Sequence, residues 1–247
     1  MVENVPSKRN KMLKTNSLNK NATLLGVGPV TKLTTDATIE LADELNIPIF
    51  LIASRNQIEC SNQGGGYVNR WSTESFSQYV RNLSSKNNII LARDHGGPWH
   101  NDREIKLQLS YNEAMKSAKE SYAMDIDSGF EFLHIDPVRD ISGHLSTNQV
   151  LERIYELLEF CFSYSAKKNK TIQYEIGTEE QSESPEENYE QVVTLVDSLK
   201  SFCKKNHFPL PVFTVIQTGT KVLEMENVGT FPSHIDQVTD EMALKKS

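Results

Sequence analysis

The chain has 247 residues, of which 38% are hydrophobic and 24% are charged, and its formal net charge is −7. This length fits one α/β domain with a substantial core, and the negative charge argues against sequence-independent nucleic-acid binding, which requires clustered cations. No apolar run is as long as a membrane span, and the N-terminus lacks the apolar block of a signal peptide.

Residues 1–20 are polar and basic, and we expect them to form an arm outside a single domain of residues 21–247. A mobile or edge-covering arm is favoured, and a phosphate-contacting arm is the alternative. Because Cys161 and Cys203 fall in apolar helical patterns, we expect buried thiols and a cytoplasmic location.

Six repeats of one pattern follow the arm, each with a short apolar run, a polar turn and an amphipathic stretch. The apolar runs predict strands and the stretches with helical spacing predict helices. The expected strands span residues 23–30, 48–53, 89–94, 130–137, 171–179 and 211–219. The expected helices span residues 34–45, 72–83, 110–124, 147–165, 185–203 and 234–244.

Strands that alternate with helices through short connections predict parallel strands with right-handed crossovers. A doubly wound sheet would accommodate this order. The uniform spacing and the polar cluster after each strand favour an α/β fold of the TIM-type (β/α) barrel class. Because only six βα units are visible, we expect an incomplete barrel that another chain completes, a shortened form of a longer protein, or an open sheet.

The stretch from Ile89 to Trp99 is the most informative part of the sequence. Four apolar residues are followed by Arg93, Asp94 and His95 and then by Gly-Gly-Pro. This pattern predicts a buried strand whose C-terminal end presents Asp94 and His95, which is where parallel α/β folds place their chemistry. The alternative is that this pair only caps the loop that follows.

Other acidic and imidazole side chains occur near the C-terminal ends of the next two expected strands. Together with the pair above, these residues are Asp94, His95, His134, Asp136, Glu175 and Glu179. Imidazole with carboxylate suits a divalent metal such as zinc. Such a metal would act as a Lewis acid on a carbonyl and stabilise an enediolate, while an adjacent carboxylate moves the proton.

Each of these residues also has a structural interpretation. We favour function for Glu175, because a carboxylate on an apolar strand needs a partner. His134 fits a hydrogen-bonded core histidine as well as a ligand, Asp136 precedes a proline and fits a turn, and Glu179 borders an acidic, solvated loop. The remaining histidines are expected to be ordinary surface residues: His100, His144, His207 and His234.

Two segments could bind a sugar or its phosphate. Asn56 and Gln57 follow an expected strand and offer amide groups that suit sugar hydroxyls. Gly64, Gly65 and Gly66 form a loop whose backbone N–H groups could face a phosphate, although such loops also serve as plain connections. No Walker or Rossmann motif is present.

Several segments together resemble one family. They are the runs at residues 54–57, 65–67, 94–98, 134–136, 176–179 and 215–219. In this order they are similar to the accessory, non-catalytic subunits of class II tagatose-bisphosphate aldolase, which are also described as tagatose 6-phosphate kinases. The resemblance covers residues 22–230, and Asp-His-x-Gly-Pro and Ile-Gly-Thr-Glu are its most specific parts.

The resemblance implies a TIM barrel related to zinc-dependent class II aldolases and to metal-dependent ketose 4-epimerases. It implies that His95 is a metal ligand, Asp94 an acid or base, and Glu179 a ligand or catalytic acid. Family members continue beyond the sixth strand, and a further expected histidine on a later strand has no counterpart in this sequence.

Two functions follow as hypotheses. The first is an accessory subunit of a class II aldolase, bound to that aldolase or to further copies of itself, since an exposed sheet edge needs a partner. The second is a zinc- or manganese-dependent aldolase or epimerase for a ketose or ketose phosphate. The expected site comprises catalytic Asp94, Glu175 and Glu179, metal-binding His95, Asp136 and Glu179, and substrate-binding Asn56, Gln57, Gly65, Gly66 and Gln217.

Overall fold

The computed structural model describes residues 24–143, 145–177, 185–215, 221–223 and 226–228. The expected N-terminal arm of residues 1–20 and the expected last helix of residues 234–244 lie outside the described residues. No helix in the described part of the chain is long and apolar enough to cross a membrane.

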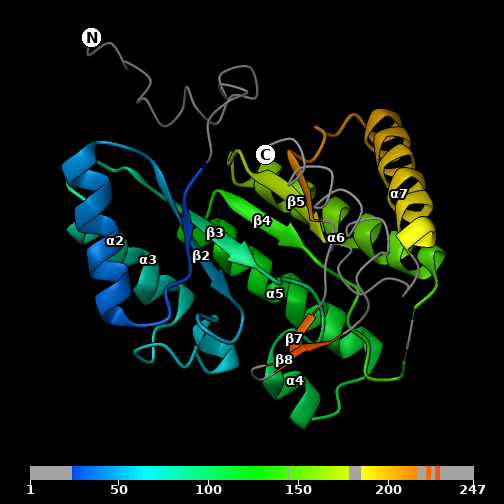
Figure 1. Cartoon of the computed structure of the whole chain (residues 1–247), viewed down its shortest axis with the longest axis horizontal. Helices are drawn as coiled ribbons and strands as arrows, with labels where there is room; N and C mark the ends of the chain where they lie inside the picture. The colour runs from blue at the N-terminus through cyan, green and yellow to red at the C-terminus, as the bar shows by residue number, and fades with distance from the viewer. Residues whose placement is uncertain (1–23, 144, 178–184, 216–220, 224–225, 229–247) are drawn as a thin grey trace, which may run out of the picture.

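Six parallel strands form one curled sheet, a half-barrel in which sequence order and spatial order agree (Figure 1). Each strand is hydrogen-bonded to the next along the chain. The strands are β1 (Gly26–Val27), β2 (Ile49–Ser54), β3 (Ile89–Asp94), β4 (Phe132–Ile135), β5 (Gln173–Gly177) and β6 (Phe213–Val215). The expected α/β barrel class, with only part of the barrel present, is therefore confirmed.

The helices cover only one face of this sheet. Along β2 and β3 the side chains alternate, so that Leu51 and Leu91 belong to the large core shared with the helices. Phe50 and Ile90 belong to a smaller apolar cluster on the other face, which includes no helix residue among those described. A doubly wound sheet would carry helices on both faces, so this arrangement excludes it and matches the outer helix layer of a barrel.

The long helices follow the strands as the sequence predicts. They are α2 (Lys32–Leu45), α3 (Thr73–Leu83), α5 (Tyr111–Ser128), α6 (Thr147–Lys167) and α7 (Pro185–Asn206). α3 begins after Ser72, whose side chain forms a capping box with Ser75. α2 begins earlier than expected, because the Thr31 hydroxyl accepts the N–H of Thr34 and caps the helix there.

Short elements were not predicted. They are the 3-10 turn η1 (Ser61–Gln63), the helix α4 (Asp102–Lys106) and the antiparallel pair β7 (Lys221–Leu223) and β8 (Glu226–Val228). All three cysteines are free and buried, so the expectation for Cys161 and Cys203 is confirmed.

Candidate functional site

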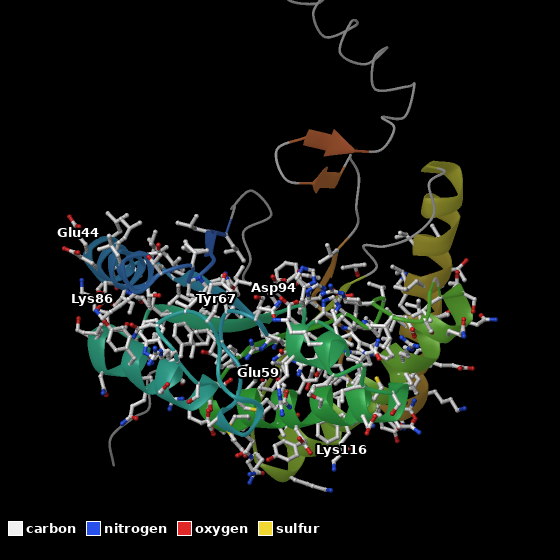
Figure 2. All side chains as sticks on the ribbon, turned by 90° about the horizontal axis from the view of Figure 1, so that it is seen from below. Glu44, Glu59, Tyr67, Lys86, Asp94 and Lys116 are labelled. Atoms are coloured by element: carbon white, nitrogen blue, oxygen red, sulfur yellow. The ribbon has the colours of Figure 1, made fainter. Side chains whose placement is uncertain are left out.

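The last residue of β3 lies on the face of the sheet opposite the helices. This face would be the interior of a complete barrel, and we call it the barrel-side face. Arg93 points to the helix side, where its guanidinium pairs with Asp125. Alternation along the strand then places Asp94 on the opposite face. Figure 2 shows Asp94 and the exposed Lys116 of α5 on opposite sides of the molecule, with Glu59 between them. His95 follows with φ of 45°, a conformation that non-glycine residues rarely adopt and that is common at functional sites.

Two histidines from the loop after β3 converge at Asp136, which follows β4. His95 Nδ1 lies 2.6 Å from Asp136 Oδ2, and His100 Nε2 lies 3.1 Å from the same oxygen. The His95 and His100 rings are stacked, with centroids 5.0 Å apart and planes 14° apart. The carboxylate is 1% exposed and the side chain of His100 is 10% exposed. Two imidazoles from one loop therefore share a single buried carboxylate oxygen.

His134 joins the cluster from β4. Its Nδ1 accepts the backbone N–H of His95 at 3.3 Å and lies 3.4 Å from Asp94 Oδ1. Its Nε2 is buried and has no hydrogen-bond partner among the described residues. Gly177 on β5 is packed against this ring, and a Cβ there would overlap Nε2. The close approach of β5 thus depends on a glycine.

Glu175 of β5 is paired in register with His134 of β4. Alternation places both on the barrel-side face, because Tyr174 and Ile176 belong to the core on the helix side. Glu175 is partly buried, and its charge contributes to raising the pKa of His134. It therefore belongs to the electrostatic environment of the cluster.

The two glycines of the Asp-His-Gly-Gly-Pro run allow this packing. A Cβ on Gly96 would overlap the ring of Tyr122, whose hydroxyl donates to the carbonyl of His134 at 2.7 Å. A Cβ on Gly97 would overlap the backbone carbonyl of Asp136. The loop after β3 and the end of β4 are therefore in direct backbone contact.

The cluster favours charged carboxylates. Burial of Asp136 by itself would raise its pKa, but the nearby His100 and the hydrogen bond from His95 outweigh burial and hold that pKa well below its usual range. Burial also opposes the shift at Asp94, yet the bond to His134 and the charge of His95 lower the pKa of Asp94. At His134 the Asp94 bond and the charge of Asp136 outweigh burial and raise the pKa.

The structure corrects the expectation for His100. Sequence reasoning took His100 for an ordinary surface residue, whereas its ring is nine-tenths buried against His95 and Asp136. No periodic signal in the sequence marks it, because it lies in a loop, five residues after His95. Of the other histidines in that group, His207 is described and exposed, while His144 and His234 lie outside the described residues.

The expected sugar-binding residues are engaged in contacts within their own turn or with the start of α4. Asn56 Nδ2 donates to Asp102 Oδ1 at 3.1 Å and Asn56 Oδ1 accepts the Asp102 N–H at 2.9 Å. Gln57 Oε1 accepts the N–H of Ser54 at 2.9 Å. A Cβ on Gly66 would overlap the Gln57 carbonyl, and Gly65 has φ of 71°, so these glycines shape the turn.

Glu179 and Gln217 lie outside the described residues. Their assignments as catalytic or metal-binding and as substrate-binding stay predictions, as does the substrate role of Asn56 and Gln57.

A buried ionic network holds the loop after β3 from the helix side. Arg55 is fully buried, with Nε 2.7 Å from Glu59 Oε2 and a terminal nitrogen 2.7 Å from Glu104 Oε1. Arg55 also donates to the carbonyl of Gly97 at 2.9 Å. Glu104 in turn accepts the backbone N–H of Trp99 at 2.5 Å. These bonds hold Gly97 and Trp99, which directly precede His100.

The donor atoms at this rim fit a divalent metal. Two groups of side chains bring one ligand atom each to within 4.8 Å of one another: Asp94, His95 and His134, and His95, His100 and Asp136. Imidazole nitrogen and carboxylate oxygen are the donors that zinc accepts. The buried Nε2 atoms of His100 and His134, both without a hydrogen bond among the described residues, are further donors that a cation would use.

Comparison with known families agrees with this architecture. The model of the family "D-tagatose-1,6-bisphosphate aldolase subunit GatZ/KbaZ-like" matches residues 10–200. The chain belongs to this family. No curated protein sequence matches the chain.

Solved structures show the same fold for the GatZ/KbaZ-like chain. One is a probable tagatose 6 phosphate kinase from Sinorhizobium meliloti 1021, with a TM-score of 0.65, 20% identity, and coverage of 90% of this chain and 56% of that one. Another is a fructose-bisphosphate aldolase from Campylobacter jejuni, with a TM-score of 0.51, 16% identity, and coverage of 90% and 60%. This chain thus spans a little over half the length of these proteins.

Proposed function

We propose that the protein is an accessory subunit of a class II aldolase that acts on tagatose bisphosphate. The match of residues 10–200 to a family described as an aldolase subunit carries this proposal. An accessory subunit contributes contact surface to a partner, so its exposed edges are the features to consider. We also propose a cytoplasmic location, which the free, buried cysteines support.

The edge of the sheet formed by β1 offers such a surface. β1 pairs only with β2 among the described strands, which leaves backbone groups on its other side for a further strand. Large apolar side chains on and beside β1 and α2 are exposed: Leu25, Val30, Leu33, Leu41, Leu45 and Ile47. Leu33 is the most exposed of them, at 77%. An apolar surface next to an open strand is typical of an interface.

The proposal is tested by co-expression with a class II tagatose-bisphosphate aldolase catalytic subunit, followed by chromatography with light scattering. We expect a stable complex and a more stable aldolase. Leu33→Glu should weaken the complex, while Leu107→Glu, which alters another exposed leucine (56%) after α4, should not. A monodisperse monomer that leaves the aldolase unchanged would contradict the proposal, and self-association alone would indicate that a second copy covers this edge.

A second candidate function is a divalent-metal-dependent aldolase or epimerase for a ketose or ketose phosphate. The convergence of His95 and His100 on one buried carboxylate oxygen of Asp136 favours it. A metal held there, zinc or manganese, would polarise a carbonyl oxygen of the sugar. Asp94, 36% exposed and 3.4 Å from His134, would move a proton, and Glu175 of β5 and Glu179 are the further carboxylates that we propose for catalysis.

Turnover of ketose and ketose-phosphate substrates with and without added zinc or manganese tests this second function. Asp94→Asn should abolish the metal-dependent activity and cost little stability, because the carboxylate is partly exposed and its contact with His134 is long, at 3.4 Å. Glu175→Gln should behave in the same way. Asn56→Ala, Gln57→Ala and Gln217→Ala should raise KM more than they lower kcat if these amides bind the sugar. Full activity in Asp94→Asn would remove the catalytic assignment.

A further inference from the structure

The loop between β3 and α4 brings a second imidazole to the rim, and its geometry resembles that of a ligand more than that of a core side chain. His100 Nε2 is buried 3.1 Å from Asp136 Oδ2, yet it has no hydrogen bond among the described residues. The two atoms are at ion-pair distance, but they do not form a hydrogen bond, so this buried nitrogen lacks the free energy that a well-formed bond would give. A cation beside Asp136 would be a common partner for the carboxylate and for this nitrogen.

We propose that His100 completes a divalent-metal site with His95 and Asp136. The inference rests on the metal-dependent candidate function described above and adds to it a ligand that sequence reasoning missed. One loop thus supplies both imidazoles, and the end of the next strand supplies the carboxylate.

The distances are compatible with this set of three. Ligand atoms about 2.1 Å from a tetrahedral zinc lie about 3.4 Å from one another. Asp136 Oδ2 is 2.6 Å from His95 Nδ1 and 3.1 Å from His100 Nε2, so shifts of under about 1 Å would bring both imidazoles to ligand spacing from the carboxylate. In the competing set, Asp94 lies 3.8 Å from His95 Nε2 and 3.4 Å from His134 Nδ1, which is equally compatible. Burial separates the two sets, because the Asp136 side chain is 1% exposed and that of Asp94 is 36% exposed.

The surroundings also keep the three ligands in place before a metal binds. Glu104 fixes the N–H of Trp99, and the Asn101 side chain donates to buried Glu59 at 3.3 Å. These bonds lie on either side of His100 in the sequence. Outer contacts of this kind orient ligands and contribute to metal affinity. Asp136 is held by the packing of Gly97 against its backbone.

Zinc titration of the purified full-length chain, stripped with a chelator and followed by calorimetry, tests the proposal. The wild type should bind about one zinc ion per chain. His100→Gln should bind it at least about tenfold more weakly, since loss of a mere outer-shell contact already costs 10–100-fold. His207→Gln, which alters an exposed histidine far along the chain after α7, should bind like the wild type.

A second measurement does not depend on how well the variant folds. In the wild-type protein, zinc should shift the ring-nitrogen NMR signals of His95 and His100 and leave that of His207 in place. Wild-type affinity in a folded His100→Gln variant, or an unmoved His100 signal, would overturn the proposal while leaving a metal at the other ligands. A wild type that binds no zinc would overturn it together with the metal-dependent function, yet it would leave the accessory role untouched.

Discussion

Asp136 and His95 are 41 residues apart in the sequence, yet Asp136 Oδ2 and His95 Nδ1 are 2.6 Å apart. The contact joins the loop after β3 to the end of β4, and the carboxylate is almost fully buried. A buried carboxylate that is bound to imidazoles contributes to the stability of the fold, in addition to any role in binding a ligand. Because these groups titrate, its contribution to the free energy of unfolding depends on pH.

Asp136→Asn should lower the free energy of unfolding at pH 7 by about 2 kcal/mol, the scale of a hydrogen bond to a charged group. The folded pKa of Asp136 lies well below its usual range. Its contribution is therefore present above the unfolded pKa of about 3.9 and is lost as pH falls toward the folded pKa. Urea unfolding with chelator present at pH 7 and pH 3.5 measures this, and a difference between wild type and variant that does not shrink in acid would contradict it.

Asp94→Asn should lower the pKa of His134. Hydrogen bonding to Asp94 is the largest of the contributions that raise that pKa against burial. With a raised folded pKa, the pair stabilises the fold below the unfolded value of about 6.5, and this contribution disappears as pH rises through the folded pKa. NMR titration of the His134 ring measures the shift. Asp127→Asn, which removes an acid paired with Lys168 at the surface, should leave the His134 titration unchanged.

Two ion pairs of equal length offer a matched test of burial. Arg55–Glu59 and Lys32–Asp36 both span four residues at 2.7 Å, but the first is fully buried and the second is exposed. Arg55→Met should cost about 3–5 kcal/mol, because it leaves buried carboxylates without their cation. Lys32→Met should leave the free energy of unfolding almost unchanged. Chemical denaturation of both variants measures this, and equal effects would show that the Arg55 network contributes little.

Gly97→Ala should destabilise the fold by about 1–3 kcal/mol, the usual cost of overpacking, since its Cβ would overlap the Asp136 carbonyl. It should also weaken zinc binding by displacing Asp136. At Gly28 an added Cβ has its nearest neighbour at 3.7 Å, so Gly28→Ala should be tolerated. Thermal melts and zinc titrations of the two variants distinguish them, and wild-type behaviour of Gly97→Ala would contradict the close contact.

Apolar runs predicted the central strands well, because burial on both faces demands such runs whatever surrounds them. Ile89–Asp94 is observed as expected. Strand six begins at Phe213, two residues later than expected, because pairing depends on the neighbour and not on the run itself; residues 216–219 of the expected strand lie outside the described residues. The start of α2 was not predicted correctly, because Thr31, Thr34 and Thr35 can all cap a helix. In the structure the Thr31 hydroxyl is the cap, and the composition of the segment does not distinguish it from the other two.

The site could be predicted only where residues followed a strand. Asp94, His134 and Asp136 are close to one another because parallel strands end at a common rim, which topology alone implies. His100 and Arg55 were missed, since their positions depend on loop conformation. Positive φ angles at His95 and Trp99 reverse the direction of the chain in the loop that carries His100. Arg55 and Glu59 pair within a loop, so the spacing rules for helices do not predict their contact.

The position of the side-chain cluster in the middle of the sheet affects which parts of the chain can vary independently. The cluster lies on β3 and β4, so β1 and β2 separate it from one margin of the sheet and β5 and β6 from the other. The side-chain cluster is thereby separated from the docking edge that we propose at β1, so we expect that a change of neighbour at either margin would leave the imidazoles in place. The proposed docking edge and the side-chain cluster can therefore evolve separately. An engineered subunit could receive a new docking edge while Asp94, His95, His134 and Asp136 are kept.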